Sequence, residues 1–249
     1  WTNIAGSVAA ALLFSACGSK VASVTHGADS GPGSLRAALE EASEDPAVTR
    51  IRIEPGVRRV GLERAATFRG PQRLTIEGGG AIVTPATRRS HDLLVATGGG
   101  GLAVRDLNFR DSSGSAMVVT IPADASGTVP IALSGVAVEG SGLFGLLVND
   151  VDSSRASIDL QIASSTFSGN GEADGVTDID AVRVNETGEG GIVATIRSCR
   201  LEGNGGDGVE LDESGAGTVE LRVRSSQFNG NGAQDPEDPE DGLDIDEAG

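Results

Sequence analysis

Acidic side chains recur at matching places in three segments near the C-terminal end of the chain. The segments read AVRVNE (181–186), GVELDE (208–213) and GLDIDE (242–247), and their alignment places carboxylates in shared columns. Calcium is a hard cation that takes six to eight oxygen ligands, so clustered carboxylates suit it. The sequence therefore predicts a Ca²⁺ site built from six aspartates: Asp180, Asp207, Asp212, Asp241, Asp244 and Asp246. The alternative is a row of solvated carboxylates without an ion.

The same alignment yields other acidic columns and an arginine. Arg183, Glu210 and Asp244 lie between inward apolar residues, so they are expected to point outward. A further column consists of Glu186, Glu213 and Glu247. Paired carboxylates such as Asp212 and Asp246 could serve as an acid and a base. A periodic ladder produces such pairs automatically, however, so they discriminate little between functions.

Four arginines suggest a second kind of site. Arg197 and Arg224 share one outward column, and the other two, Arg200 and Arg222, are close by on adjacent repeats. Guanidinium groups bind carboxylate or sulfate groups through paired hydrogen bonds, so this patch is predicted to bind an acidic glycan. The alternative is that these arginines form salt bridges with Glu202 and Glu220 nearby.

These residues belong to a unit that recurs along the chain. IRSCRLEGNG (196–205) returns as VRSSQFNGNG (223–232), and 223 − 196 = 27 residues. The same frame occurs upstream as IASSTFSGNG (162–171), and more weakly as LSGVAVEGSG (133–142) and VRDLNFRDSS (104–113). Self-similarity at a period of about 20 to 50 residues indicates a fold in which each unit stacks on its neighbour.

The columns of the aligned units indicate strands. One column is apolar: Phe109, Val138, Phe167, Leu201 and Phe228. Other apolar columns alternate with polar or small residues, and this period of two is typical of strands with one buried face. Cys199 lies two places before the Phe column and is predicted to be a small buried core residue. A polar column follows, whose asparagine amides can form a ladder: Ser112, Ser141, Asn170, Asn204 and Asn231.

Composition favours one elongated domain and narrows the classes of partner. The 249 residues include 37 glycines, no tyrosine and only 3% aromatic residues. Such a composition would give a globular domain a weak core, whereas a solenoid fills its narrow interior with aliphatic side chains. The formal net charge is −17, with 19 Lys+Arg against 36 Asp+Glu. We therefore expect no nucleic acid and no anionic membrane surface as a partner of the body of the protein.

An apolar run opens the chain. Residues 4–14 read IAGSVAAALLF, which is too short to span a bilayer as a mature helix. The run resembles the end of a secretory signal peptide, and the following LFSAC resembles a bacterial lipoprotein processing site at which Cys17 is lipidated. Residues 1–20 are thus expected to be the leader of an exported bacterial surface protein, in contact with a membrane only through a lipid anchor. The alternative is an apolar segment that caps the solenoid.

A short helix is predicted after Ser34. This residue follows a turn and is a good N-cap, four apolar residues at helical spacing follow, and Pro46 ends the segment. Such a helix would cover the first coil and protect its open edge. The stretch DSGPGSLRAAL, with the strand at 51–53 and LTIEGGGAIV (74–83), resembles the start of bacterial right-handed parallel β-helix repeat proteins, which share the pectate-lyase-like architecture.

The resemblance covers nearly all of residues 21–249 and implies an all-β fold, a single-stranded right-handed parallel β-helix with a short N-terminal capping helix. The cap is expected at about residues 21–50 and the regular coils at about 102–249. The last segment, DGLDIDEAG, matches only the beginning of a unit. The chain is therefore expected either to be a fragment of a longer solenoid or to have its C-terminal edge covered by something outside this sequence.

The family implied by the resemblance includes lyases, hydrolases and adhesins. Its polysaccharide lyases combine Ca²⁺ with a lysine or arginine base, and the only lysine, Lys20, lies in the leader, so Arg183 is the candidate base. An arginine among carboxylates normally keeps its proton. We therefore predict a surface scaffold that binds an acidic polysaccharide or a surface protein and is stabilised by Ca²⁺. The alternatives are a Ca²⁺-dependent polyuronate lyase and a structural spacer without a ligand.

Overall fold

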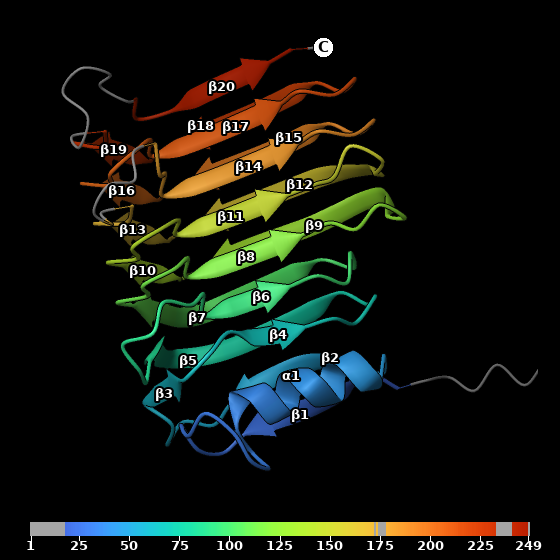
Figure 1. The fold of residues 1–249 in the computed structure, drawn as a ribbon, viewed down its shortest axis with the longest axis vertical. Coiled ribbons are helices and arrows are strands. Elements are labelled where there is room, and N and C mark those ends of the chain that lie inside the picture. Colours follow the sequence, from blue (N-terminus) through green and yellow to red (C-terminus); the bar gives the residue numbers. More distant parts are fainter. Residues whose placement is uncertain (1–17, 172, 174–177, 233–240, 249) are drawn as a thin grey trace, which may run out of the picture.

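Parallel strands stacked along one axis make up most of the chain. The computed structural model describes residues 18–171, 173, 178–232 and 241–248. In Figure 1 the strands lie one above another, in chain order from the N-terminal end to the C-terminal end. Every strand pair in the described residues is parallel, so the fold is an all-β parallel solenoid.

The first half of the chain is the less regular one. It begins with a strand and the helix, and its strands vary from three to twelve residues. Its elements are β1 (Lys20–Val24), α1 (Leu35–Glu44), β2 (Val48–Ile53), β3 (Arg59–Leu62), β4 (Ala66–Phe68), β5 (Leu74–Pro85), β6 (Leu94–Ala96), β7 (Leu102–Arg110) and β8 (Met117–Thr120).

From Ser126 onward each coil has a long strand, a short strand and a third strand. The long strands are β9 (Ser126–Ser134), β12 (Arg155–Ala163), β15 (Ile192–Arg197) and β18 (Val219–Arg224). The short strands are β10 (Ala137–Glu139), β13 (Thr166–Ser168), β16 (Arg200–Glu202) and β19 (Gln227–Asn229). The third strands are β11 (Leu146–Asn149), β14 (Val182–Glu186), β17 (Val209–Glu213) and β20 (Asp244–Glu247).

Two sheets result from this stacking. The larger sheet has 13 strands and contains the long and the short strands, which meet at β7. The smaller sheet has seven strands in the order β20-β17-β14-β11-β8-β6-β4. Register partners in the larger sheet are the residues that the repeat alignment placed in one column; Phe109, Val138 and Phe167, for example, follow one another on successive coils. The predicted stacking of the repeats is therefore confirmed.

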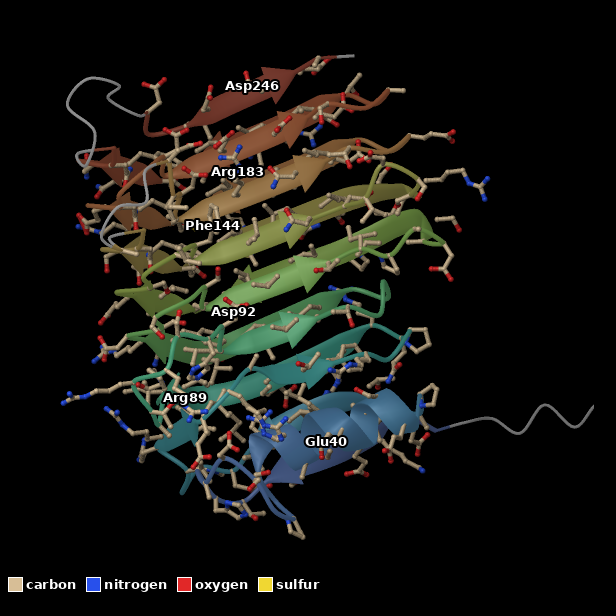
Figure 2. The ribbon with its side chains drawn as sticks, in the orientation of Figure 1. Glu40, Arg89, Asp92, Phe144, Arg183 and Asp246 are labelled. Carbon is tan, nitrogen blue, oxygen red and sulfur yellow. The ribbon has the colours of Figure 1, made fainter. Side chains whose placement is uncertain are left out.

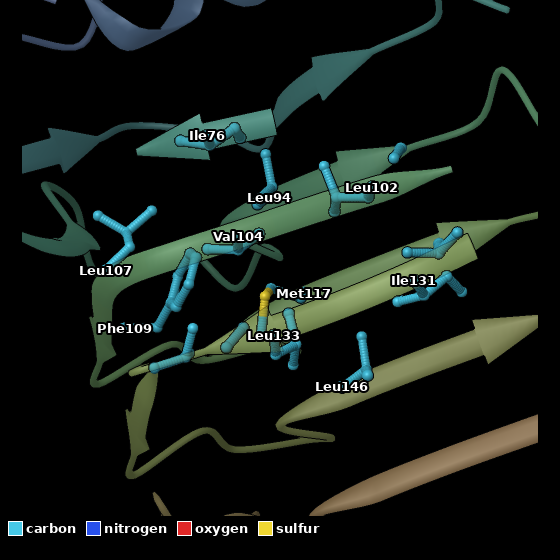
Figure 3. Packing of buried hydrophobic residues seen from close by; sticks show 14 of the residues in the cluster. Ile76, Leu94, Leu102, Val104, Leu107, Phe109, Met117, Ile131, Leu133 and Leu146 are labelled. Carbon is cyan, nitrogen blue, oxygen red and sulfur yellow. The ribbon is translucent and has the colours of Figure 1, made fainter. Parts of the chain in front are cut away.

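The interior between the sheets is filled by aliphatic side chains and a few phenylalanines. Figure 3 shows Val104, Phe109 and Leu133 of the larger sheet facing Met117 and Leu146 of the smaller one. All five are at most 1% exposed. Because every coil adds its own apolar residues, the core continues along the stack, and three percent aromatic residues suffice to fill it.

Polar ladders also link the coils. Asn170 Nδ2 donates to Asn204 Oδ1 at 2.9 Å, and Asn204 Nδ2 donates to Asn231 Oδ1 at 2.7 Å. Asn170 and Asn204 are buried, so the predicted asparagine ladder lies inside the structure. Cys199 is buried as well, and its thiol donates to the carbonyl group of Arg197 at 3.2 Å.

The predicted helix is observed as α1 and covers one edge of the smaller sheet. Ser34 Oγ accepts the Ala37 N–H at 3.1 Å as an N-cap, and α1 lies against β4, the terminal strand of that sheet. The buried Arg36 side chain donates to the Ala65 carbonyl group at 2.7 Å. Ser43 Oγ accepts the N–H group of Arg69 at 2.9 Å. Side chains of α1 thus satisfy backbone groups beside an edge strand, which protects the edge from unwanted pairing.

Regular stacking begins earlier than the sequence repeat suggests. β5 already pairs with β7 over most of its length, with Leu74 opposite Leu102 and Val83 opposite Phe109. The register shifts between Glu77 and Ala81, where Gly79 and Gly80 have positive φ angles of 58° and 83°. Two additional residues are accommodated at this bulge, and they obscure the repeat in the sequence.

Candidate functional site

The outward side chains of four strands in the smaller sheet form what we call the charged face. β11, β14, β17 and β20 each contribute two residues, in two rows along the stack. One row is Leu147, Arg183, Glu210 and Asp244, and the other is Asn149, Asn185, Asp212 and Asp246. In Figure 2, Arg183 lies on β14, between the two ends of this face, and Asp246 lies at its β20 end. The face thus changes from neutral groups to carboxylates toward β20.

Arg183 is the centre of a cluster of three carboxylates. Its Nη1 atom lies 3.3 Å from Asp180 Oδ2 and 3.5 Å from Asp178 Oδ2, and it also pairs with Glu210 on β17. The strand pairing brings Arg183 and Glu210 together, because they are register partners. The Asp180 side chain is 0% exposed and that of Arg183 is 18% exposed, so solvent screens these two charges weakly, whereas Asp178 is more than half exposed.

The cluster shifts the pKa values of its members. Burial raises the pKa of Asp180. Burial also raises the pKa of Glu210 to about 8, and the adjacent Asp180 charge contributes to this rise. Burial alone would lower the pKa of Arg183, but the charges of Glu210, Asp180 and Asp178 outweigh it and raise the pKa. Arg183 therefore remains a cation, while Asp180 and Glu210 bind a proton more readily than ordinary carboxyl groups do.

Amide side chains continue the network toward β11. Arg183 Nε donates to Asn185 Oδ1 at 3.0 Å, and Asn185 Nδ2 donates to Asn149 Oδ1 at 2.8 Å. These residues line an open hollow of about 600 Å³, together with Asp152, Ser153, Thr187 and Asp212. The hollow thus offers hydrogen-bond donors and acceptors of several kinds on a preformed surface.

Three carboxylates converge at the other end of the charged face. Oxygen atoms of Glu210, Asp244 and Asp246 lie within 4.8 Å of one another. Asp212 is adjacent, as the register partner of Asp246. Burial raises the pKa of Asp212, the charge of Arg183 opposes this rise, and Asp246 adds to it. Oxygen ligands grouped in this way fit a hard cation, and Glu210, Asp244 and Asp246 are the residues that would hold it.

Three of the six predicted calcium ligands lie in a separate column. Asp180 Oδ1 accepts the N–H of Asp207 at 2.7 Å, and Asp207 Oδ1 accepts the N–H of Asp241. Asp180 and Asp207 are buried, whereas Asp241 is exposed. Asp92 plays the same part earlier in the stack, accepting the N–H of Ser115 at 2.8 Å. These carboxylates link successive coils, and the structure does not bring Asp207 or Asp241 together with the group at Asp244 and Asp246.

A row of buried carboxylates lies behind the charged face. Asp150, Glu186 and Glu213 are 5%, 0% and 0% exposed. One oxygen atom of each accepts a backbone N–H group: that of Val151, Gly188 and Gly215, respectively. The other oxygen atom of each has no hydrogen-bond partner among the described residues. Burial raises the pKa of Glu186 to about 7, and the neighbouring carboxyl groups of Asp150 and Glu213 raise it as well.

The four arginines predicted to bind an acidic glycan lie on the larger sheet and do not form a single cluster. Arg197 and Arg224 are register partners, and neither has an ion pair in the part of the chain that the structure describes. The other two form ion pairs on their own strands, Arg200 with Glu202 and Arg222 with Glu220. The salt-bridge alternative therefore holds for Arg200 and Arg222.

Some residues of these sites were not singled out from the sequence. Glu210 was expected to face outward, but the alignment did not show that it joins both the Arg183 cluster and the carboxylate group at β20. Asp150 was not among the predicted residues, although it follows Asn149 as Glu186 follows Asn185, and this shared position is the signal that could have identified it. The buried position of Glu213 was visible in the alternation of VELDE, where it falls on the same face as Val209 and Leu211.

The predicted leader and its cysteine fall outside the described residues. Cys17 belongs to residues 1–17, and of the predicted leader the structure describes only residues 18–20. Within the described ranges, no helix has the length and apolar character needed to cross a bilayer.

Comparison with known proteins does not place the chain in a family. No protein-family model matches the sequence, no curated protein matches it, and no solved structure matches its fold.

Proposed function

We propose that the chain is a right-handed parallel β-helix of the pectate-lyase-like superfamily that acts at the bacterial surface as a glycan-binding scaffold. The observation that supports this role best is the hollow of about 600 Å³ on the charged face, with amide, hydroxyl, carboxylate and guanidinium groups around it. Export, with lipidation at Cys17, is supported by the apolar run and the LFSAC sequence alone.

The chemistry of the hollow suits sugar hydroxyl groups. Each hydroxyl both donates and accepts, and Asn149, Asn185 and Ser153 can do the same. Asp152 and Asp212 add acceptors, and the hydrogen bond that Asn185 donates to Asn149 fixes the orientation of both amides. Asn149 and Asn185 present the same amide on adjacent coils, about 4.8 Å apart along the stack. A linear polymer lying along the stack could therefore make this contact on two successive coils.

The proposal includes a Ca²⁺ ion bound at the β20 end of the charged face. Glu210, Asp244 and Asp246 would supply oxygen ligands there, and the cation would offset the repulsion among carboxylates on adjacent coils. Asp178, Asp180 and Glu210 form a second group of suitable oxygen atoms, but all three are ion-paired with Arg183, whose positive charge disfavours a cation there. Among the described residues, Glu210 is the only member of the β20 group that has this ion pair. The Ca²⁺ site is therefore proposed at Asp244 and Asp246 with Glu210, and Asp212 lies beside it.

The polyuronate lyase alternative has less support. Its base would be Arg183, but the three carboxylates around this residue raise the pKa of the guanidinium group and so oppose proton abstraction. A scaffold needs only that Arg183 stay charged, so the same geometry favours binding over catalysis.

Glycan binding is tested with the whole chain on an array of acidic and neutral glycans, with Ca²⁺ or with EDTA, followed by calorimetric titration of the best ligands. The hollow variant Asn149→Ala/Asn185→Ala should weaken binding by about tenfold or more, since it removes two pairs of polar contacts. The control variant Gln227→Ala/Asn229→Ala removes two exposed amides from another strand and should bind like the wild type. Absence of binding to any glycan, or release of unsaturated products from polyuronates, would overturn the proposal.

Calcium binding is tested separately by thermal unfolding. At about 5 mM Ca²⁺, which exceeds the dissociation constants of extracellular calcium modules, the melting temperature should rise by about 2 to 9 °C relative to EDTA. Asp244→Asn/Asp246→Asn should abolish this rise. Glu40→Gln/Glu44→Gln removes the same charge from α1 and should retain it. An equal rise in both variants would place the cation elsewhere, and no rise in the wild type would remove Ca²⁺ from the proposal.

A further inference from the structure

A second hollow, of about 390 Å³, lies on the outer face of the larger sheet. It crosses β7, β9, β12 and β15, and an arginine lines each end: Arg105 on β7 and Arg197 on β15. Between them the same row contains only Ser134 and Ala163. Two long side chains separated by two small ones give the hollow its shape, and we call it the arginine groove.

The positive charges of the arginine groove are not neutralised by nearby carboxylates. Within the described ranges, neither Arg105 nor Arg197 forms an ion pair. Glu77 is the register neighbour of Arg105, but it is already ion-paired with Arg50 and Arg52. A pair of uncompensated cations aligned on one row, in a chain of net charge −17, marks a local site for anions.

Neutral hydrogen-bonding groups lie between the two cations. Gln161, Thr195 and Ser134 all line the groove. Gln161 Nε2 donates to Asp159 at 3.2 Å, which leaves the amide oxygen of Gln161 able to accept from a hydroxyl group. Asp159, the acidic residue of β12, is not among the residues that line the groove. Cations at both ends with neutral polar groups between them match a ligand that carries both acidic groups and hydroxyls.

The spacing of the arginines indicates a polymer. Arg105 and Arg197 are separated by three coil steps, or roughly 14 Å at about 4.8 Å per step. This separation of the two backbones is longer than a single sugar unit. We infer that the arginine groove binds a linear acidic polysaccharide lying along the stack, with one carboxylate or sulfate group at Arg105 and another at Arg197. This inference rests on the glycan-binding role proposed above, but it uses a different face of the protein.

The test measures affinity for acidic chains of defined length. The whole chain is titrated with oligogalacturonides of increasing length, with dextran sulfate and with uncharged dextran. We expect binding of both acidic polymers, none of dextran, and a rise in affinity of about tenfold or more once an oligogalacturonide is long enough to reach both arginines. Preference for one acidic polymer identifies carboxylate or sulfate as the group bound. Tighter binding of oligothymidylate than of either acidic polymer would overturn the inference in favour of a nucleic acid.

Matched variants separate the groove from general charge effects. Arg105→Gln/Arg197→Gln should weaken binding of long oligomers by about tenfold or more and remove the dependence on length. Arg89→Gln/Arg155→Gln makes the same change in net charge at exposed arginines outside the groove, and it should bind within about twofold of the wild type. Equal loss in both variants would overturn the inference. If only Asn149→Ala/Asn185→Ala lost binding of acidic glycans, the inference for the arginine groove would be overturned, and the proposed glycan-binding function would stand.

Discussion

Glu186 and Glu213 are register partners on adjacent coils, and both side chains are fully buried. Burial disfavours the charged form of Glu186, and the neighbouring carboxyl groups of Asp150 and Glu213 disfavour it further. Asp150 extends the row on the other side of Glu186, and its pKa is also raised by burial. The interior of the solenoid thus contains an acidic row whose charge depends on pH.

This row predicts that the protein loses stability as the pH rises. The pKa of Glu186 is about 7 in the folded chain, against 4.5 for an ordinary glutamate. The folded state therefore keeps a proton that the unfolded state has released. The resulting stability is fully present below pH 4.5 and is lost as the pH rises through about 7, by at most about 1.4 kcal/mol per pH unit for one proton. Melting temperatures measured between pH 5 and 8 should fall accordingly.

Glu186→Gln tests the origin of this loss, because glutamine forms hydrogen bonds without ionising. We expect the decline of its melting temperature to be much shallower than that of the wild type. Glu210 has a pKa raised to about 8 and also titrates in this range, so Glu210→Gln is measured as the comparison. A wild-type slope in Glu186→Gln, together with a flat one in Glu210→Gln, would assign the proton to the Arg183 cluster instead.

Replacement of Arg183 should destabilise the protein strongly. In Arg183→Gln the carboxylates of Asp178, Asp180 and Glu210 lose the cation that they share. Breaking a buried ion pair from one side costs about 3 to 5 kcal/mol. The loss should be larger at pH 8 than at pH 5, because protonated carboxyl groups do not repel each other. Urea unfolding at the two pH values measures it.

Arg222→Gln is the matched control for that experiment. Arg222 pairs with Glu220, but both side chains are more than half exposed. Exposed pairs contribute about 0 to 1 kcal/mol, so this variant should unfold almost like the wild type. Similar losses in Arg183→Gln and Arg222→Gln would mean that the Arg183 cluster is not a buried network.

The asparagine ladder should contribute more stability than surface asparagines do. Asn204→Ala removes the amide that donates to Asn231 and accepts from Asn170, and it leaves buried polar groups unpaired. We expect a loss of about 2 to 4 kcal/mol in urea unfolding. Asn229→Ala changes an exposed asparagine on β19 and should cost less than about 0.5 kcal/mol. Equal effects would show that the ladder is not a significant source of stability.

The fold could be predicted because every repeat carries the same alternation. Phe109, Val138 and Phe167 occupy one column of the alignment and one row of the structure, since a parallel stack places equivalent residues opposite each other. The early coils were harder to recognise, because the bulge at Gly79 and Gly80 shifts the register. A local insertion of this kind changes the length of one repeat in the sequence but leaves the parallel pairing of the strands unchanged.

The candidate sites were only partly predictable, because an alignment gives rows but not contacts. It placed Asp244 and Asp246 on one face, yet it could not show that the Asp180 carboxylate would turn to the Asp207 N–H group. The row from Arg105 to Arg197 was present in the alignment. The hollow could not be predicted from this row alone, because it depends on the small side chains of Ser134 and Ala163 between the two arginines.

A final prediction concerns Cys199 and tests how well the interior tolerates a substitution at this position. Ser165 and Ser226 hold the equivalent places on the neighbouring coils, and the Ser226 hydroxyl accepts the N–H of Cys199 at 3.2 Å. Cys199→Ser should therefore change the free energy of unfolding by less than about 1.5 kcal/mol, because the hydroxyl group can bond the Arg197 carbonyl as the thiol does.

The thiol itself should be inert in the folded protein. It is 4% exposed, and burial raises its pKa, so little thiolate forms at neutral pH. Alkylation followed by peptide mass spectrometry distinguishes Cys199 from Cys17, and we expect the Cys199 peptide to be labelled only after unfolding in urea. Rapid labelling in native buffer would mean that the coil around Cys199 opens, and the tight stacking inferred for the β12–β18 part of the stack would then be wrong.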